Sequence, residues 1–133
     1  MVHALSEARR VLRPGGILID LRPAAQHRRV GVLGDGRTTW LGRMREEFDE
    51  DRAAGRAVAE VLRRGELRRA ARIVFSCRRV MDTLADLKAF LNDMRVQPHD
   101  WLVERVRRSL ALGRRGRRIV VEAPLVARVL LKP

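Results

Sequence analysis

The stretch that decides the fold lies near the start of the chain, at residues 5–20, and reads LSEARRVLRPGGILID. Its first half predicts a helix, because its apolar residues recur at the three-to-four-residue spacing of one helical face. Pro14 ends that helix, and the two glycines behind it allow a tight reversal. The apolar run at 17–21 then predicts a short parallel strand that helices cover on both faces. This order of elements is typical of an α/β (or α+β) fold.

Turn residues and a change of period divide the middle of the chain. Asp35-Gly36 stands between two short apolar segments, which predicts a β-hairpin over residues 30–41. Residues 42–64 follow a helical pattern, and the acidic group Glu46 to Asp51 lies near its start, where negative charge suits the helix dipole. Consecutive helical side chains point in different directions, so we interpret this group as a solvated helix start and not as a cation site.

The last half of the chain predicts two long strands with helices between them. Residues 66–80 alternate with period two, which indicates a half-exposed strand. Two helices follow, the second ending at Gly113, and a final strand spans residues 117–132. Pro124 within that strand favours an edge position or a bulge, because proline cannot donate to a ladder.

Length and composition favour one soluble domain over residues 1–133. The chain is 46% hydrophobic and 34% charged, which supplies enough apolar material for a core. Cys77 is the only cysteine, so no disulfide can form within the chain, and a reducing cytoplasmic location fits. The N-terminal pattern is an amphipathic helix and not a signal peptide, and no apolar run is long enough to span a membrane.

The segment from Leu5 to Asp20 carries a resemblance to a known family, and residues 7–16, EARRVLRPGG, hold its motif. It resembles the helix and following strand found late in class I S-adenosylmethionine-dependent methyltransferases of the type 11 group, where the pattern reads E-A-x-R-V-L-[KR]-P-G-G. The later order of strand, helices and strand is similar to the closing part of the same fold. The resemblance implies a truncated methyltransferase-like mixed sheet with flanking helices and a β-hairpin.

The same resemblance implies that the cofactor half of the fold is missing. In the family a glycine-rich turn and an acidic strand end, both upstream of the matched helix, hold the cofactor. The only glycine cluster after a strand, residues 31–36, lacks the G-x-G-x-x-G spacing and does not lead into a helix. We therefore expect no cofactor, no cofactor-binding residue and no catalytic residue, and we expect the isolated chain not to be an enzyme.

The isolated polar residues of the sequence do not indicate a catalytic, metal or ligand site. His3, His27 and His99 are scattered and share no metal-ligand or triad spacing, so we expect no metal site. Cys77 falls on the apolar side of its predicted strand, which favours a buried, inert thiol. Asp20 ends the strand at 17–21, where α/β sheets place ligands, but it lacks the rest of a site.

The net charge of +13 raises the possibility of a polyanion partner. Lys88 and Lys132 are the only lysines among 29 basic residues, an imbalance that a GC-rich genome also produces. Two arginine runs could contact phosphates, although we favour their interpretation as solvated loops. They consist of Arg63, Arg64, Arg68 and Arg69, and of Arg114, Arg115, Arg117 and Arg118.

The sequence thus leads to three hypotheses about function. The favoured one is a non-catalytic methyltransferase-like domain that forms a homo-oligomer or binds a protein partner, because a sheet without its first half exposes the strand at 17–21. The second is a basic module that binds nucleic acid or another polyanion. The third is methyltransferase activity that appears only when another chain supplies the cofactor site.

Overall fold

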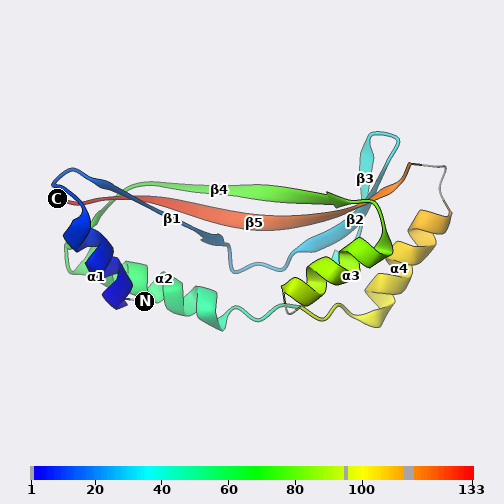
Figure 1. The fold of residues 1–133 in the computed structure, drawn as a ribbon, viewed down its shortest axis with the longest axis horizontal. Helices are drawn as coiled ribbons and strands as arrows, with labels where there is room; N and C mark the ends of the chain where they lie inside the picture. Colours follow the sequence, from blue (N-terminus) through cyan, green and yellow to red (C-terminus); the bar gives the residue numbers. More distant parts are fainter. Residues whose placement is uncertain (1, 95, 113–115) are drawn as a thin grey trace. The chain divides into compact units, whose positions relative to one another are not determined.

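The computed structural model describes residues 2–94, 96–112 and 116–133, and within these it has four helices and five strands (Figure 1). In chain order they are α1 (Val2–Val11), β1 (Ile17–Pro23), β2 (Arg29–Gly34), β3 (Arg37–Arg43), α2 (Asp49–Arg63), β4 (Arg68–Met81), α3 (Leu84–Asp93), α4 (Asp100–Ala111) and β5 (Arg118–Leu131). The α/β (or α+β) class and the hairpin, formed by β2 and β3, are confirmed. The predicted helix end at Gly113 lies outside the described residues.

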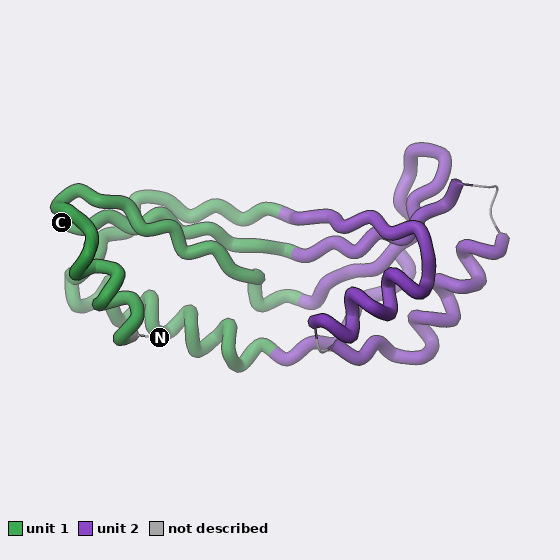
Figure 2. Tube along the Cα trace, in the orientation of Figure 1, with its two compact units in different colours: residues 1–26, 48–75, 124–133 green, residues 27–47, 76–123 purple. Residues whose placement is uncertain are grey.

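The chain divides into two compact units, coloured separately in Figure 2. Unit 1 comprises residues 1–26, 48–75 and 124–133, and unit 2 comprises residues 27–47 and 76–123. Strands β4 and β5 each contribute residues to both units. Each unit contains helices, strands and a hydrophobic cluster of its own.

The sheet is open and antiparallel, and β5 takes part in most of its strand pairs. Residues 125–131 of β5 pair with β1, residues 118–122 pair with β2, and β4 also pairs with β5. Pro124 lies between the two paired ranges, and its carbonyl accepts a hydrogen bond from the Ala24 N–H at 2.9 Å. Pro124 thus lies where the partner of β5 changes from β2 to β1. Its missing N–H therefore removes no hydrogen bond from the β2–β5 or the β1–β5 ladder.

The strand predicted at 17–21 is present, but two expectations about it are wrong. β1 runs antiparallel to β5, and it is not buried on both faces. The turn after α1 explains the direction, because Gly15 adopts φ +73° and hydrogen bonds join the backbones of Gly15 and Gly16 to Lys132 just beyond β5. β1 begins beside the end of β5 and so runs against it.

The core of unit 1 lies between α2 and the strands. α2 presents buried residues at helical spacing, including Val58 and Val61, and these pack with Leu67 and with Leu130 of β5. Leu18 of β1 and Leu5 of α1 add partly buried side chains to this cluster. The amphipathic pattern of the sequence thus accounts for the buried side of each of these elements.

The core of unit 2 lies between α3, α4 and the strands. Its cluster joins residues from β2, β4, α3, α4 and β5 with Met44, which follows β3: Val30, Met44, Met81, Leu87, Leu91, Leu102, Val106, Ile119 and Val121. The β2–β3 turn is formed by Asp35 at φ 52° and Gly36 at φ +73°, the backbone that an Asp-Gly pair favours. Thr83 and Asp86 form a capping box that starts α3.

Two further expectations need correction. The helix expected over residues 42–64 begins only at Asp49, because Gly42 and Arg43 extend β3 by pairing with Val30 and Arg29. The thiol of Cys77, expected to be buried, is exposed. Alternation places Cys77 on one side of β4, but nothing among the described residues covers that side, since residues 72–80 are all exposed.

Candidate functional site

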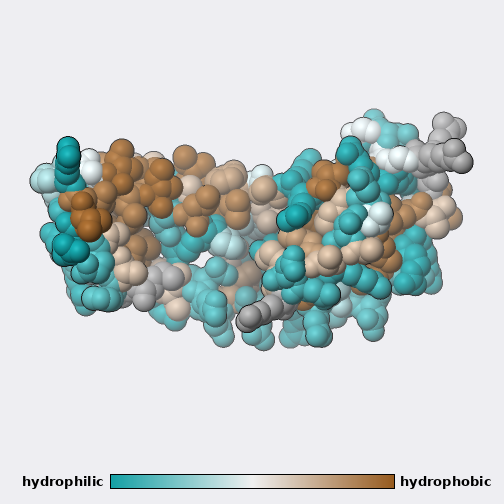
Figure 3. All heavy atoms as spheres, in the orientation of Figure 1, coloured by the Kyte–Doolittle hydropathy of each residue, from teal (hydrophilic) through white to brown (hydrophobic). Residues whose placement is uncertain are grey.

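Unit 1 carries an uncovered apolar surface on β1 and β5, which we call the apolar strand face. It comprises three residues of β1 and their direct partners on β5: Ile17, Ile19 and Leu21 with Leu131, Val129 and Ala127. The β1 members alternate with the core residue Leu18 and are 57%, 65% and 56% exposed. Directly opposite residues of antiparallel strands share a face, so all six point to one side. Figure 3 shows hydrophobic residues gathered over the strands of unit 1.

β4 exposes apolar side chains as well. Ile73, Val74 and Phe75 are consecutive, and each is 41% exposed or more. Consecutive strand residues point to opposite faces, so both faces of β4 are open at this point. Within the described ranges β4 pairs only with β5. Unit 1 therefore combines an uncovered face with a strand that has an unpaired edge, and both features favour contact with another chain.

Asp20 is neutralised and not poised for chemistry. Its Oδ2 accepts hydrogen bonds from Arg22 at 2.7 Å and from Arg128 at 3.0 Å, and all three side chains are largely buried. The Nε and Nη1 atoms of Arg22 are buried and have no hydrogen-bond partner within the described structure. The group carries one negative and two positive charges, so it fixes β1 to β5 at a cost in desolvation.

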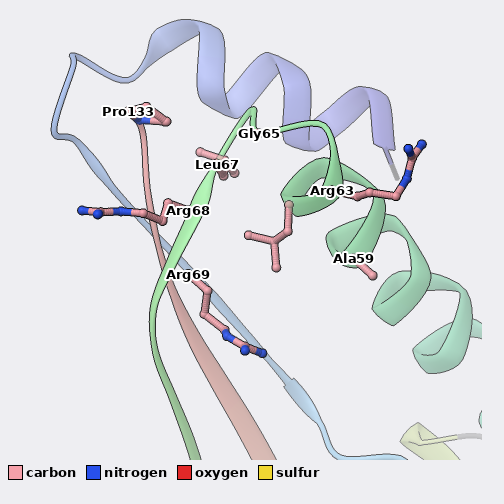
Figure 4. Close-up of a pocket in the computed structure, with 8 residues that line it drawn as sticks. Ala59, Arg63, Gly65, Leu67, Arg68, Arg69 and Pro133 are labelled. Carbon is pink, nitrogen blue, oxygen red and sulfur yellow. The ribbon is translucent and has the colours of Figure 1, made fainter.

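A pocket in unit 1 lies beside the first predicted arginine run (Figure 4). Its lining combines apolar residues with three basic ones: Ala59, Leu62, Gly65, Leu67 and Pro133 with Arg63, Arg68 and Arg69. Figure 4 shows that the side chains of Arg68 and Arg69 leave β4 in different directions and that Arg63 points away from β4. The rim is basic, but the three guanidinium groups do not converge on one point.

The four arginines of this run differ in whether they form an ion pair. Glu60 accepts hydrogen bonds from Arg63 and Arg64, at 2.7 Å in each case. These two bonds lower the pKa of Glu60 to about 2. Arg68 and Arg69 are exposed and have no ion-pair partner in the part of the chain that the structure describes. The run thus contains two guanidinium groups that share Glu60 and two that have no described carboxylate partner.

The second run is only partly described. Arg114 and Arg115 lie outside the described residues. Arg117 donates a hydrogen bond to the carbonyl of Ser109 at 2.8 Å, which ties β5 to the end of α4. Arg118 is exposed at the start of β5. Of the two described members, Arg118 is the more exposed, and Arg117 is partly engaged by Ser109.

Sequence reasoning missed an ionic cluster in unit 2 that is centred on Glu122. This carboxylate is buried, and each of its oxygens accepts a bond from one arginine, Oε1 from Arg29 Nε at 2.7 Å and Oε2 from Arg78 Nε at 2.6 Å. Arg29 lies over the ring of Trp40, with its guanidinium carbon 3.9 Å from the ring centre. Burial raises the pKa of Glu122, but the bonds from Arg78 and Arg29 outweigh this effect and hold the pKa below its usual value.

Other polar residues in the described ranges form local contacts. His27 Nδ1 accepts a hydrogen bond from the Glu46 N–H, and His99 stacks against Trp101 with 6.0 Å between ring centres. Glu46 forms an ion pair with Arg28 and lies outside α2, so only Asp49, Glu50 and Asp51 of the acidic group stand in the first helical turn. Among the described residues no cluster of three metal-ligating side chains occurs.

One property bears on membranes. None of the described helices combines the length and the apolar character that a bilayer crossing requires.

Comparisons with known proteins assign the chain to no family. No family model matches the chain. No curated protein matches it significantly, and no solved structure does so either.

Proposed function

We propose that the chain is a non-catalytic, methyltransferase-like domain that acts by self-association through the apolar strand face. The observation that carries this proposal is the exposure of Ile17, Ile19 and Leu21, each more than half exposed on one face of β1. Their partners on β5 are also apolar. A contiguous apolar surface of this kind on a folded domain marks an interaction site. The methyltransferase likeness rests on residues 7–16 and on the strand that follows them.

A second copy of the same chain is the occupant that best suits this face. None of its six residues is charged, so two copies that meet there bring no like charges into direct contact, although each chain carries +13. A two-fold dimer would place the same face on itself, and two sheets can pack in this way at a spacing of about 10 Å. Full burial of one aliphatic side chain contributes about 1.5–3 kcal/mol, and each copy offers three that are largely exposed.

Sedimentation of the wild-type chain and of Ile19→Glu tests the proposal. We expect a dimer at low micromolar concentration, and we expect Ile19→Glu to weaken it by about tenfold or more, because a carboxylate would be desolvated at the centre of the face. Leu112→Glu is the matched control, since Leu112 is 85% exposed outside the face. A wild-type chain that stays monomeric at high micromolar concentration would refute self-association.

Polyanion binding is a second candidate function, and a specific observation favours it. Arg68 and Arg69 are exposed and lack ion-pair partners in the described structure, on a chain of net charge +13. Such guanidinium groups can neutralise phosphates and release counterions. Retention on heparin at physiological salt, weakened by replacement of both arginines with glutamine, would support this function. Passage of the wild-type chain without retention would exclude it.

A cytoplasmic location is part of the same proposal. Cys77 is a free thiol on the exposed strand β4. Reducing compartments keep such thiols from oxidising, whereas secreted proteins rarely leave one exposed. Localisation of a tagged full-length chain tests this expectation.

A further inference from the structure

The cluster around Glu122 holds two arginines in fixed positions at the surface of unit 2. Arg29 and Arg78 come from β2 and β4, and both donate through Nε to the same buried carboxylate. Their side chains are 40% and 56% exposed, whereas that of Glu122 is only 8% exposed. The carboxylate thus anchors the inner edges of two guanidinium groups whose outer parts reach solvent.

Some N–H groups of Arg29 and Arg78 donate to no described acceptor. Arg29 donates through Nε to Oε1 of Glu122, with its Nη2 2.6 Å from the same oxygen in an ion pair, and Arg78 donates through Nε to Oε2. Arginine has five N–H groups, so Nη1 of Arg29 and both Nη atoms of Arg78 keep donors that no described group accepts. These are the fork atoms that grip phosphate oxygens.

The ring of Trp40 restricts the movement of Arg29. Trp40 is the cross-strand partner of Gly31, and a Cβ added to Gly31 would lie 2.9 Å from the Trp40 ring, so the ring lies directly beside that glycine. The guanidinium of Arg29 lies over the ring, and that of Arg78 is 5.7 Å from its centre. An exposed arginine normally loses rotamer entropy when it binds a ligand. Here much of that entropy is already lost in the free protein.

We propose that Arg29 and Arg78 together bind one phosphate of a nucleic-acid backbone. Two guanidinium groups and one carboxylate leave a net charge of +1, which a phosphodiester, with its single negative charge, balances. The proposal rests on the polyanion-binding function above and adds a phosphate site in unit 2 to the exposed arginines Arg68 and Arg69 of unit 1. A strand is favoured over a free phosphate because the site is open to solvent, and contacts on one side alone need support from further contacts along a polymer.

Fluorescence anisotropy with a labelled single-stranded oligothymidylate of about 20 nucleotides tests the proposal. We expect Arg78→Gln to weaken binding roughly five- to tenfold at low salt and to reduce the slope of log affinity against log salt by about one. Arg10→Gln removes the same charge from an arginine that is 71% exposed and paired with a single carboxylate. This control should change affinity less than about twofold.

The outcomes distinguish a failure of the phosphate site at Arg29 and Arg78 from a failure of polyanion binding in general. If the wild-type chain binds the oligonucleotide but Arg78→Gln behaves like Arg10→Gln, the site is wrong while polyanion binding survives. If the wild-type chain does not bind at all, both fail. Circular dichroism of each variant shows whether the fold is retained.

A second readout follows Trp40 directly. Trp40 and Trp101 are the only tryptophans, so Trp101→Phe leaves a single indole beside the proposed site. A bound strand on Arg29 and Arg78 should shield Trp40 from quenching by acrylamide. Unchanged quenching at saturating oligonucleotide would contradict the proposal even where binding itself is retained.

Discussion

Glu122 is a carboxylate in the interior of unit 2 that is stabilised only because two arginines face it. Its burial opposes ionisation, and the bonds from Arg78 and Arg29 reverse that effect, so its pKa in the folded chain lies below its usual value. A group with a lowered folded pKa stabilises the fold above its unfolded pKa, and this contribution is lost as the pH falls through the folded pKa. The cluster should therefore weaken in acid.

We expect Glu122→Gln to reduce the free energy of unfolding by about 1–3 kcal/mol at pH 7, because two guanidinium groups lose their shared acceptor. Urea unfolding at pH 7 and near pH 3 would measure it, and the difference from the wild-type chain should shrink at the lower pH. Glu104→Gln is the matched control. Glu104 also pairs with two arginines but is 40% exposed, so its loss should cost less than about 1 kcal/mol.

Replacement of Arg22 should have the opposite effect on the free energy of unfolding. Two of its buried nitrogens have no hydrogen-bond partner in the described structure, and Asp20 keeps Arg128 if Arg22 is removed. Arg22→Met should therefore leave the unfolding free energy unchanged or raise it, since unpaired buried donors cost about 1–3 kcal/mol each. Thermal unfolding is the measurement, and a loss of more than about 1 kcal/mol would contradict this account.

At the scale of elements, two glycines of different backbone conformation make a matched pair. Gly36 closes the β2–β3 hairpin at φ +73°, whereas Gly55 lies inside α2 with open space where a Cβ would be. Gly36→Ala should destabilise the chain by about 1–2 kcal/mol because of its left-handed backbone. Gly55→Ala should stabilise it by about 0.5–1 kcal/mol. Chemical denaturation of both variants checks the pair, and equal effects would refute the assigned conformations.

Local chemistry explains which elements could be predicted. The Asp35-Gly36 turn and the alternation along β4 depend on neighbouring residues, so the sequence predicts them well. The direction of β1 depends on hydrogen bonds between Gly15, Gly16 and Lys132, which no local pattern reveals. Alternation likewise assigns Cys77 to one side of β4 but does not say whether another element covers that side.

The candidate sites, too, could be predicted from the sequence only where neighbouring residues determine them. The loss of neighbouring strands implied by the resemblance predicts an exposed β1, and Ile17, Ile19 and Leu21 are exposed, whereas their partners on β5 are half-buried. The Glu122 cluster was not foreseen, because Arg29 and Arg78 are 93 and 44 residues away from Glu122 in the chain. The sequence does not show that Arg63 and Arg64 share the carboxylate of Glu60, three and four residues earlier, as the structure finds.

At the scale of the whole molecule, the net charge of +13 acts on the two proposed functions in opposite directions. Two copies repel each other, and salt screens that repulsion, whereas salt competes with arginines for phosphate. Raising KCl from about 50 to 500 mM should therefore tighten the dimer and weaken oligonucleotide binding. Sedimentation equilibrium and anisotropy across this range measure both. A dimer that dissociates with salt would be held by ion pairs and not by the apolar strand face.

The exposed Cys77 on β4 has a practical consequence at the bench. Because it is the sole cysteine of the sequence, maleimide reagents will attach one fluorophore or spin probe per molecule without any engineering. Air oxidation will also link molecules covalently in pairs, so samples for sedimentation must contain a reductant such as TCEP if a disulfide is not to be mistaken for the non-covalent assembly.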